Sequence, residues 1–375
     1  MLENIPLSSQ DITQQEIDEV VSVLKGDRLA LGPQIEAFEQ ACAEVSDRKY
    51  GIAVNSGTSG LHLCVKAAGI KPGDEVITTS FSFIATTNCI FFEHAKPVFV
   101  DIDPESYNID PAAIEAAITP KTKAILPVEV FGNTAHFDKY EAIAKKHNLV
   151  LIEDSCEAIG GLLGQRKAGS FGLCSTFAFY PNKQITTGEG GMIVTDDIEF
   201  RDMCRALRNQ GRHPNDSWLE HTYMGYNYRI SEITAALGKV QVSRLGEIVA
   251  KRRAVAQMYD AAFANLQANG KLHIPVMTQK EQASYFVYVI RLADRYSQAD
   301  RNSLMQFLRE NKIGCNSYFA PIHTQKYVTE LLGTKRGDFP ITEAISDRTI
   351  ALPFFANMTQ LQVERVVDLI AKFLK

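Results

Sequence analysis

The sequence predicts an α/β protein, with a large domain built on a mostly parallel, seven-stranded sheet and a smaller C-terminal α+β domain. Two observations lead to this prediction. From residue 51 to about residue 200, short apolar runs alternate with helical patterns, which is typical of a parallel sheet covered by helices on both faces. After about residue 250 the alternation stops, and helical patterns dominate with few strand-like runs between them.

Seven runs are the expected strands of the large sheet. Several are apolar on both faces, as strands buried between two helix layers are. The helices between them carry apolar stripes at helical spacing, for example Tyr140, Ile143 and Ala144. The expected strands are 51–54, 75–78, 97–100, 124–128, 149–152, 175–179 and 192–195.

The C-terminal part is expected to be a separate but firmly attached domain. No repeat, low-complexity segment or Gly/Ser-rich linker interrupts the sequence, so we expect domains of 15–248 and 249–375, with residues 1–14 packing with the second. A cleft between the two is the expected site of chemistry. The elements expected in the second domain are helices at 251–266, 301–311 and 359–374, a strand at 285–290 and a short strand near 316–318.

The composition is that of an ordinary globular protein. It is 45% hydrophobic and 22% charged, which excludes a disordered tail, a collagen-like fibre and a mucin-like stalk. Lys and Arg number 39 against 44 Asp and Glu, so the formal net charge is −5. This balance supplies no general attraction for nucleic acid or for an anionic membrane, and any anionic ligand must be bound locally.

The cysteines and the hydropathy pattern predict the cellular compartment of the protein. Seven cysteines with no C-x-x-C pair indicate free thiols in a reducing environment. The first residues show no basic segment followed by an apolar stretch, and no apolar run approaches the ~20 residues that cross a bilayer. We therefore expect a cytoplasmic protein.

A first candidate site follows the strand at 51–54. The segment 55–60 consists of small hydroxyl, amide and glycine residues and leads into an apolar-periodic helix. Backbone N–H groups at such a helix start lie at the positive end of the helix dipole and bind phosphate. The alternative is an ordinary helix N-cap, because Ser and Thr are preferred there in any helix.

A carboxylate and a lysine follow two other strands. Asp154 comes directly after the strand at 149–152, and ligands of parallel sheets sit beyond the carboxyl ends of strands, so it is a candidate partner for a cationic ring or a metal, or else a helix cap. Lys183 follows the strand at 175–179 and precedes the glycines of 186–191. A buried lysine amine suits Schiff-base chemistry, although most lysines are solvated surface residues. Phe83 follows the strand at 75–78 and can stack on a ring or pack in the core.

Together these features match the four parts of pyridoxal 5′-phosphate: its phosphate, its ring face, its ring nitrogen and its aldehyde. Here the sequence resembles the DegT/StrS-type sugar aminotransferases, which are fold-type-I pyridoxal-phosphate enzymes, along essentially the whole chain. The segments that carry the resemblance are 73–78, 97–102, 153–155, 179–183, 187–191 and 225–229. The spacing shows no catalytic metal site and no Gly-x-Ser-x-Gly or Walker-type loop.

The resemblance implies roles for the central residues. Lys183 would hold the cofactor as a Schiff base and carry the proton between substrate and cofactor, and Asp154 would keep the pyridine nitrogen protonated. The phosphate would bind at the turn of Gly57, Thr58 and Ser59, and Phe83 would lie against the ring. Pyridoxamine 5′-phosphate would be the intermediate form of the cofactor.

The resemblance also shows two positions at which this sequence differs from its relatives, and it implies residues that contact the partner subunit or the substrate. Ala178 stands where relatives carry a phosphate-binding serine, and Glu157 stands where they commonly carry Gln or His beside the cofactor. Asn227 matches a residue that reaches the phosphate of the partner subunit, which implies a homodimer with shared active sites. The candidates for substrate contact are Arg229, Tyr318 and His323, of which Arg229 also suits a buried ion pair and His323 a structural role.

The function implied is transfer of an amino group from L-glutamate to a keto-sugar, in surface polysaccharide or deoxyamino-sugar biosynthesis. The expected acceptor is a nucleotide-linked 4-keto-6-deoxyhexose. One alternative is a free keto- or aldehyde-sugar of the octulosonate or inosose type. Another is a non-catalytic regulator that binds pyridoxal phosphate, although the sequence shows no DNA-binding helix-turn-helix segment.

Overall fold

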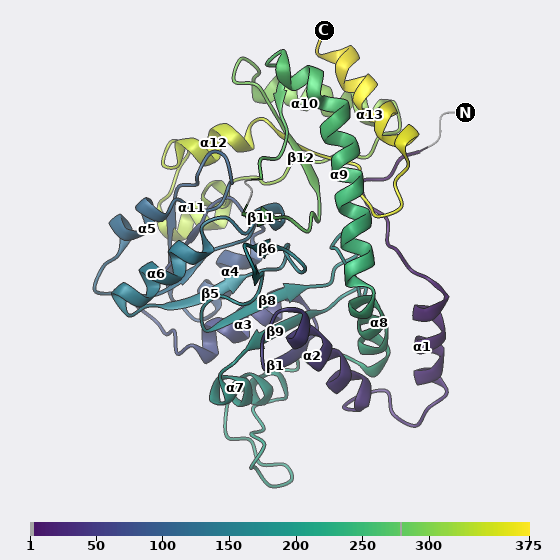
Figure 1. Cartoon of the computed structure of the whole chain (residues 1–375). Helices are drawn as coiled ribbons and strands as arrows, with labels where there is room; N and C mark the ends of the chain where they lie inside the picture. Colours follow the sequence, from purple (N-terminus) through teal and green to yellow (C-terminus); the bar gives the residue numbers. More distant parts are fainter. Residues whose placement is uncertain (1–3, 278–279) are drawn as a thin grey trace.

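The computed structural model describes residues 4–277 and 280–375, and it is built around a seven-stranded sheet (Figure 1). The strand order is β1-β9-β8-β5-β4-β2-β3. Only β9 runs against its neighbours, and every other adjacent pair is parallel. The strands are β1 (Tyr50–Val54), β2 (Glu75–Thr79), β3 (Lys96–Val100), β4 (Thr122–Leu126), β5 (Val150–Asp154), β8 (Cys174–Ala178) and β9 (Gly191–Thr195).

The predicted fold class is confirmed, and each of the seven expected runs is a strand of this sheet. The largest difference is at β4, which was expected to continue to residue 128 and ends at Leu126. Pro127 follows it and has no N–H to donate to a neighbouring strand. Pairing resumes for one residue at Val128, which forms an isolated bridge with Asp154.

Helices cover both faces of the sheet, because successive strand residues point to opposite sides. Ile52 and Val54 pack with α3, α4 and α7, whereas Ala53 between them packs with α2 and α8 on the opposite face. Helices α5 and α6 cover the same face as α2 and α8, farther along the sheet. These helices are α2 (Pro33–Val45), α3 (Gly57–Ala67), α4 (Ala85–Phe92), α5 (Pro111–Ala117), α6 (Phe137–His147), α7 (Ile198–Arg208) and α8 (Glu232–Ser243).

The C-terminal part has its own sheet, of order β10-β12-β13, and its own apolar core. The expected helices are present, and the expected strand at 285–290 begins only at Tyr288, because Tyr285 has a left-handed φ of 50°. The short strand expected near 316–318 is wrong: it is a single bridge between Asn316 and Ala351. The elements are α9 (Leu245–Ala268), β10 (Leu272–His273), β12 (Tyr288–Leu292), α10 (Gln298–Glu310), α11 (Lys326–Leu332), α12 (Pro340–Ser346), β13 (Thr349–Leu352) and α13 (Gln360–Phe373).

Helix α9 joins the two parts. Its first turns, with Ile248 and Val249, pack on the large sheet, and its later turns, with Tyr259 and Phe263, belong to the core of the C-terminal part. We therefore keep 15–248 and 249–375 as our proposed division of the chain.

The N-terminal segment contacts both parts of the molecule. Ile5 exchanges backbone hydrogen bonds with residues 312 and 314, and Asp11 forms ion pairs with Arg244 and Lys251. These contacts support our proposal that the segment 1–14 packs with the C-terminal part, although its residues 1–3 lie outside the described structure. The segment leads into α1 (Gln14–Leu24), which packs on α8.

Smaller elements complete the structure. A three-stranded sheet of order β11-β6-β7 lies apart from the other two, and within residues 4–277 and 280–375 we found no helix with the length and apolar character to span a bilayer. The elements are β6 (Leu162–Leu163), β7 (Arg166–Lys167), β11 (Glu281–Gln282) and the 3-10 turns η1 (Val130–Gly132) and η2 (Ile322–Thr324).

Candidate active site

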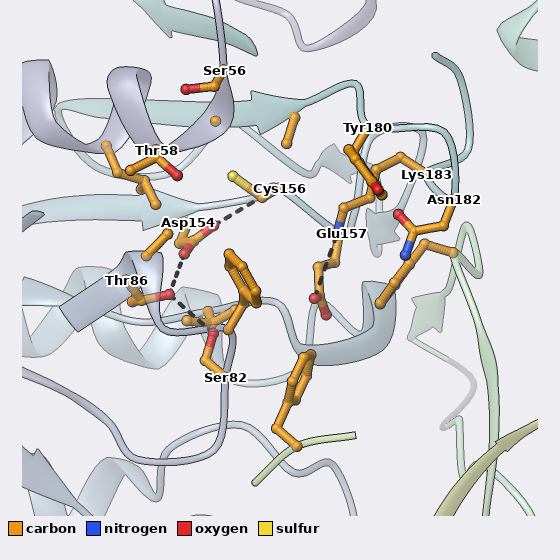
Figure 2. A pocket seen from close by; sticks show the side chains of 18 of the residues that line it. Ser56, Thr58, Ser82, Thr86, Asp154, Cys156, Glu157, Tyr180, Asn182 and Lys183 are labelled. Carbon is orange, nitrogen blue, oxygen red and sulfur yellow. Dashed lines mark hydrogen bonds and ion pairs between the residues drawn. The ribbon is translucent and has the colours of Figure 1, made fainter. Parts of the chain in front are cut away.

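A cavity of about 540 Å³ opens at the carboxyl ends of the parallel strands. Its polar wall comes from the large sheet and its helices, and Figure 2 shows the side chains of this wall converging on the cavity. Its opposite wall includes Phe286, Tyr318 and Phe319 of the C-terminal part. The cavity therefore lies where a ligand of a parallel sheet is expected, between the two parts of the chain.

The start of α3 forms one end of the cavity. Ser56 is the N-cap, and its Oγ accepts a hydrogen bond from the amide of Ser59 at 3.1 Å. Gly57 and Thr58 line the cavity, and their amides belong to the first helical turn, which has no intrahelical acceptors. A Cβ at Gly57 would lie 2.7 Å from the Cβ of Ala178, so glycine is required for this close approach. The turn thus presents free amides of the kind that bind anions at helix N-termini.

Ser59, which was expected at the phosphate, lies outside the cavity lining. Its hydroxyl donates to Asn55 Oδ1 at 2.6 Å and contacts Ser56 Oγ at 2.9 Å, and the residue is buried. Ser56 lines the cavity instead. The helical turn decides this, because side chains at successive positions point in different directions around the axis.

Asp154 ends β5 at the floor of the cavity and is buried. Its Oδ2 accepts from Thr86 Oγ1 at 2.7 Å and its Oδ1 from the Cys156 amide at 3.2 Å, as the dashed lines in Figure 2 show. Burial raises the pKa of Asp154, and the two hydrogen bonds and the charge of Lys183 oppose that rise. A buried carboxylate held in this way is a suitable partner for a cationic ring nitrogen.

Lys183 enters the cavity from the turn after β8. Its Nζ lies 3.5 Å from Glu157 Oε1 and 4.0 Å from the centre of the Phe286 ring. Its carbonyl accepts from Arg252 of α9 at 2.8 Å, so the C-terminal part helps to hold the lysine backbone. The side chain is only 12% exposed, which places the amine in the sheltered setting that Schiff-base chemistry requires.

Glu157 lies beside Lys183 and is also buried. Its Oε2 accepts from the amide of Phe131 at 2.8 Å, which orients the other oxygen toward Lys183. Burial raises the pKa of Glu157, while the charge of Lys183 and the Phe131 amide oppose the rise. The carboxylate of Glu157, which stands where relatives commonly carry Gln or His, therefore has the amine of Lys183 beside it.

Aromatic rings form much of the remaining lining. Phe83 lines the cavity and is 60% exposed, so a flat ligand can lie against it. Tyr318 stacks on Phe286 with ring centres 6.1 Å apart, and its hydroxyl accepts from Asn182 Nδ2 at 3.4 Å. Tyr318 therefore lies in the cavity wall, where the sequence predicts substrate contact.

Three other predicted residues are not part of this cavity. Asn227 and Arg229 lie on a segment that pairs with residues 207–211, and Arg229 donates to Asn209 Oδ1 at 2.8 Å and Gln210 Oε1 at 2.6 Å. His323 is fully buried between two polar partners, at 2.6 Å from Ser80 Oγ and 3.0 Å from Glu343 Oε1. His323 is therefore outside the cavity lining, and its contacts fit the structural role that the sequence analysis gave as the alternative.

Several lining residues were not predicted from the sequence. Thr86 binds Asp154 from the first turn of α4, and Phe286 faces Lys183 from the C-terminal part. The four-residue spacing of Ser82 and Thr86, whose hydroxyls are 3.0 Å apart, is a local signal that could have indicated Thr86. Other polar lining residues are Ser56, Cys156, Tyr180, Asn182 and Glu189; all but Cys156 fall in the marked segments 55–60, 179–183 and 187–191, although the sequence did not single them out.

The family model that matches this sequence covers residues 10–371, and it describes the DegT/DnrJ/EryC1/StrS aminotransferase family. The chain belongs to this aminotransferase family. Among its relatives is GDP-perosamine synthase of Caulobacter vibrioides, 38% identical over 90% of this chain and 89% of the relative. Another is the spore coat polysaccharide biosynthesis protein SpsC of Bacillus subtilis, 35% identical over 99% of this chain and 97% of the relative.

A solved structure extends the comparison to the cofactor. Spr1654 of Streptococcus pneumoniae, in its PMP form, matches the aminotransferase with a TM-score of 0.93 and 26% identity, covering 99% of each chain. Its PLP form gives the same TM-score and identity. The resemblance predicted from the sequence is confirmed, and the family implies pyridoxal phosphate as the cofactor of this aminotransferase.

Proposed function

We propose that this sugar aminotransferase moves an amino group from L-glutamate to a nucleotide-linked 4-keto-6-deoxyhexose, in polysaccharide or deoxyamino-sugar biosynthesis. The observation that carries the catalytic assignment is the convergence of Lys183, Asp154 and the α3 N-terminus on one cavity. The relatives support the acceptor, since one is named for GDP-perosamine and another for polysaccharide biosynthesis. The free thiols of the seven cysteines support a cytoplasmic location.

The cavity fits pyridoxal phosphate by the chemistry of its residues. The first turn of α3, with Gly57 and Thr58, would bind the phosphate, and Asp154 would face the ring nitrogen. Phe83 would lie against the ring, and the amine of Lys183 would hold the aldehyde carbon. When bound, the cofactor supplies a carbonyl for amines and a ring that withdraws electrons from the substrate α-carbon.

The protein groups then have distinct tasks. The Thr86 and Cys156 hydrogen bonds favour the charged form of Asp154, which would hold a proton on its cationic partner. The free amine of Lys183 would act as the base and acid that holds the proton exchanged at the substrate α-carbon. Glu157 and the face of Phe286 keep that amine in place, because Glu157 Oε1 lies 3.5 Å from Lys183 Nζ and the centre of the Phe286 ring lies 4.0 Å from it.

The charge of the cavity supports a homodimer with shared sites. In the described structure the lining contains one basic residue, Lys183, and three acidic ones, Asp154, Glu157 and Glu189. Glutamate, the cofactor phosphate and a sugar nucleotide are all anions, so further cations or donors must reach the cavity from elsewhere. A second copy of the chain would supply Asn227 to the phosphate and Arg229 to a substrate anion.

The exposed apolar residues near Asn227 support the same assembly. Trp218 is 80% exposed, Leu219 66% and Met224 81%, and all three lie between the two paired segments that hold Asn227 and Arg229. Apolar side chains clustered on a projecting loop are typical of a protein–protein contact. Mixed dimers that combine a Lys183→Ala subunit with an Asn227→Ala subunit should regain activity if each site draws on both chains.

The proposal is tested by loading the protein with pyridoxal phosphate and following glutamate-dependent formation of 2-oxoglutarate with a panel of acceptors. We expect turnover with nucleotide-linked 4-keto-sugars. Turnover only with unlinked octulosonates or inososes would replace the acceptor in this proposal, and no half-reaction with glutamate would favour a non-catalytic protein. Borohydride reduction should attach the cofactor mass to the peptide that contains Lys183, and its attachment elsewhere would refute the role of Lys183.

A further inference from the structure

Residues 207–229 form a hairpin whose base lies against α3. At the base, the amides of Tyr226 and Tyr228 donate to the carbonyls of residues 207 and 208 at 2.6 and 3.0 Å, and Asn209 and Asn227 form an antiparallel bridge. The rest of the hairpin projects from the molecule beyond α7 (Figure 1). The direction of this projecting segment is therefore set by the few contacts at its base.

The base is held by a buried histidine that has no place in the cavity. His62, in the second turn of α3, is 4% exposed. Its Nδ1 lies 3.1 Å from the hydroxyl of Tyr228, and its Nε2 lies 2.8 Å from Oε1 of Glu93, the residue after α4. Three side chains from three segments thus form one chain of hydrogen bonds.

The chemistry of the three groups determines which of them donates each hydrogen bond. An ionised carboxylate only accepts hydrogen bonds, so His62 must present Nε2–H to Glu93. A neutral imidazole carries one proton, which leaves Nδ1 as an acceptor for the Tyr228 hydroxyl. Each polar group of the set then has a partner, which is the condition for a stable buried network.

Aromatic packing surrounds His62. Its ring centre lies 4.9 Å from that of Tyr226 and 5.1 Å from that of Phe92, and Tyr226 stacks on Tyr228 at 4.8 Å with a 9° angle between planes. Lys66 pairs with Glu93 at 3.0 Å and lies over the Tyr226 ring. The charged groups that face His62 are Glu93 and Lys66, and the titratable ones are Tyr226 and Tyr228.

A second set of bonds ties the same hairpin residues to Asn55, the residue before the N-cap of α3. The amide of Asn55 donates to the carbonyl of Tyr228 at 2.9 Å, and its Nδ2 lies 3.5 Å from the carbonyl of Asn227. Asn55 is in turn fixed by the hydroxyl of Ser59 at 2.6 Å. His62 of α3 and Asn55, which precedes the N-cap of α3, therefore hold the hairpin base at two points, and the first turn of α3 also lines the cavity through Gly57 and Thr58.

We propose that Tyr228, His62 and Glu93 form a positioning relay that fixes the hairpin base on α3 and so sets where Asn227 is presented. The relay is a property of the chain by itself. Only its consequence for the cofactor rests on the proposed function, in which Asn227 reaches the partner's phosphate. The three residues act through the hairpin and touch neither substrate nor cofactor.

The relay has a pH dependence with a definite sign. A protonated imidazole donates from both nitrogens and cannot accept from the Tyr228 hydroxyl. Burial lowers the pKa of His62 below its ordinary value, with Glu93 opposing and Lys66 adding to the effect. Because the folded pKa lies below the unfolded one, the relay's contribution is present above about pH 6.5 and is lost as the pH falls through the folded pKa.

The experiment measures amide hydrogen exchange of peptides covering 207–211 and 225–229, in protein without cofactor. Tyr228→Phe keeps the stacked ring and removes one hydroxyl, so we expect protection factors there to fall on the order of tenfold at pH 7.5, as for one lost buried hydrogen bond. We expect the wild type to lose further protection at pH 5.5, and His62→Gln, which retains a donor and an acceptor that do not titrate, should abolish this extra loss. Unchanged protection in Tyr228→Phe would overturn the proposal.

A matched control distinguishes the relay from general loosening. Tyr226→Phe keeps the ring that packs on His62 and removes only the hydroxyl, which interacts with Lys66, so protection should stay within about twofold of wild type. An equal loss of protection in both variants would reject the relay, because removal of either hydroxyl would then loosen the hairpin base to the same extent.

The same variants test the link to the cofactor. With pyridoxal phosphate bound, Tyr228→Phe should lose cofactor faster on dialysis than the wild type and Tyr226→Phe do. Faster hydrogen exchange with unaltered cofactor loss would support the relay and reject the partner-subunit role of Asn227. If wild-type protein binds no pyridoxal phosphate, the proposed function fails, and the exchange measurement still decides the relay.

Discussion

The two walls of the cavity differ in kind. The wall from the large sheet holds the groups that ionise or bind anions, namely Asp154, Glu157, Lys183 and the first turn of α3. The wall from the C-terminal part contributes Phe286, Tyr318 and Phe319, whose side chains carry a single polar group, the Tyr318 hydroxyl, which accepts from Asn182. The ionisable groups of the cavity therefore come from the strand ends of the large sheet, whereas the packing of the C-terminal part determines the shape of the cavity.

The largest effect is expected at the sheet wall, from Lys183→Ala. Removing the amine removes both the covalent anchor and the proton carrier, so turnover should fall by at least about 10³-fold. The long-wavelength absorbance of bound pyridoxal phosphate should also disappear, while the thermal midpoint changes little. Lys167→Ala, at a solvent-exposed ion pair with Asp47, is the control and should keep full activity. Substantial turnover in Lys183→Ala would remove the residue from its role.

A graded pair of variants examines the carboxylate of the same wall. Asp154→Asn keeps the shape but not the charge, and turnover should fall by about 10²-fold or more, because the partner nitrogen loses its proton. Thr86→Val removes one of the two hydrogen bonds to Asp154, so a loss of about tenfold is expected. Steady-state 2-oxoglutarate formation measures both. A Thr86→Val effect equal to that of Asp154→Asn would contradict the ranking.

The pH dependence of the free energy of unfolding tests a pair of buried carboxyl groups in the large domain, Glu129 and Glu153, which lie outside the cavity lining. Glu129 is fully buried, and in the described structure neither of its oxygens has a well-formed hydrogen bond. Burial and then the neighbouring Glu153 raise the pKa of Glu129 well above its usual range, and burial raises the pKa of Glu153 to about 7, with Arg48 opposing. Folded pKa values above the unfolded ones mean that stability is lost as the pH rises toward 8.

Glu129→Gln removes one of these titrations. Its thermal midpoint should exceed that of the wild type by about 2–4 °C at pH 8 and match it near pH 5, measured by calorimetry. Glu105→Gln changes an exposed glutamate and should shift neither value. A higher midpoint for Glu129→Gln at pH 5 but not at pH 8 would show that the sign is wrong.

The smallest effect is expected at the aromatic wall, from Tyr318→Phe. Its hydroxyl has a single long hydrogen bond with Asn182, so the KM for the sugar should rise about two- to fivefold with little change in kcat. Tyr296→Phe, which removes a hydroxyl with a similar 3.4 Å contact to Arg295 away from the cavity, should change neither constant. A kcat loss as large as that of Asp154→Asn would mean that the aromatic wall also takes part in the chemistry.

Sequence patterns predicted the features that depend on neighbours along the chain. Asp154 and Lys183 follow buried strands, and both lie in the cavity because the carboxyl ends of parallel strands share one edge of the sheet. The same reasoning put Gly57 and Thr58 in the lining but also included Ser59, which the helical turn directs toward Asn55. Alternation and spacing do not show which way a side chain points around the first turn of a helix.

Contacts between distant segments were beyond these patterns. Phe286 reaches Lys183 across more than a hundred residues of sequence, and His62 meets Glu93 and Tyr228 only because α3, α4 and the hairpin base pack together. His323 looked like a substrate contact from its local motif, yet packing buries it between Ser80 and Glu343. A motif specifies a residue type, whereas its exposure depends on what folds over it.

By itself, the sequence determined the seven strands, their buried character and the chemical groups at their ends, because strand periodicity and turn chemistry are local properties. The tertiary structure decided which groups became partners: Thr86 for Asp154, Glu157 and Phe286 for Lys183, and His62 for Tyr228. The physical reason is that hydrogen bonds and charge pairs act over a few ångströms, and only the packed chain brings residues so far apart in sequence within that range.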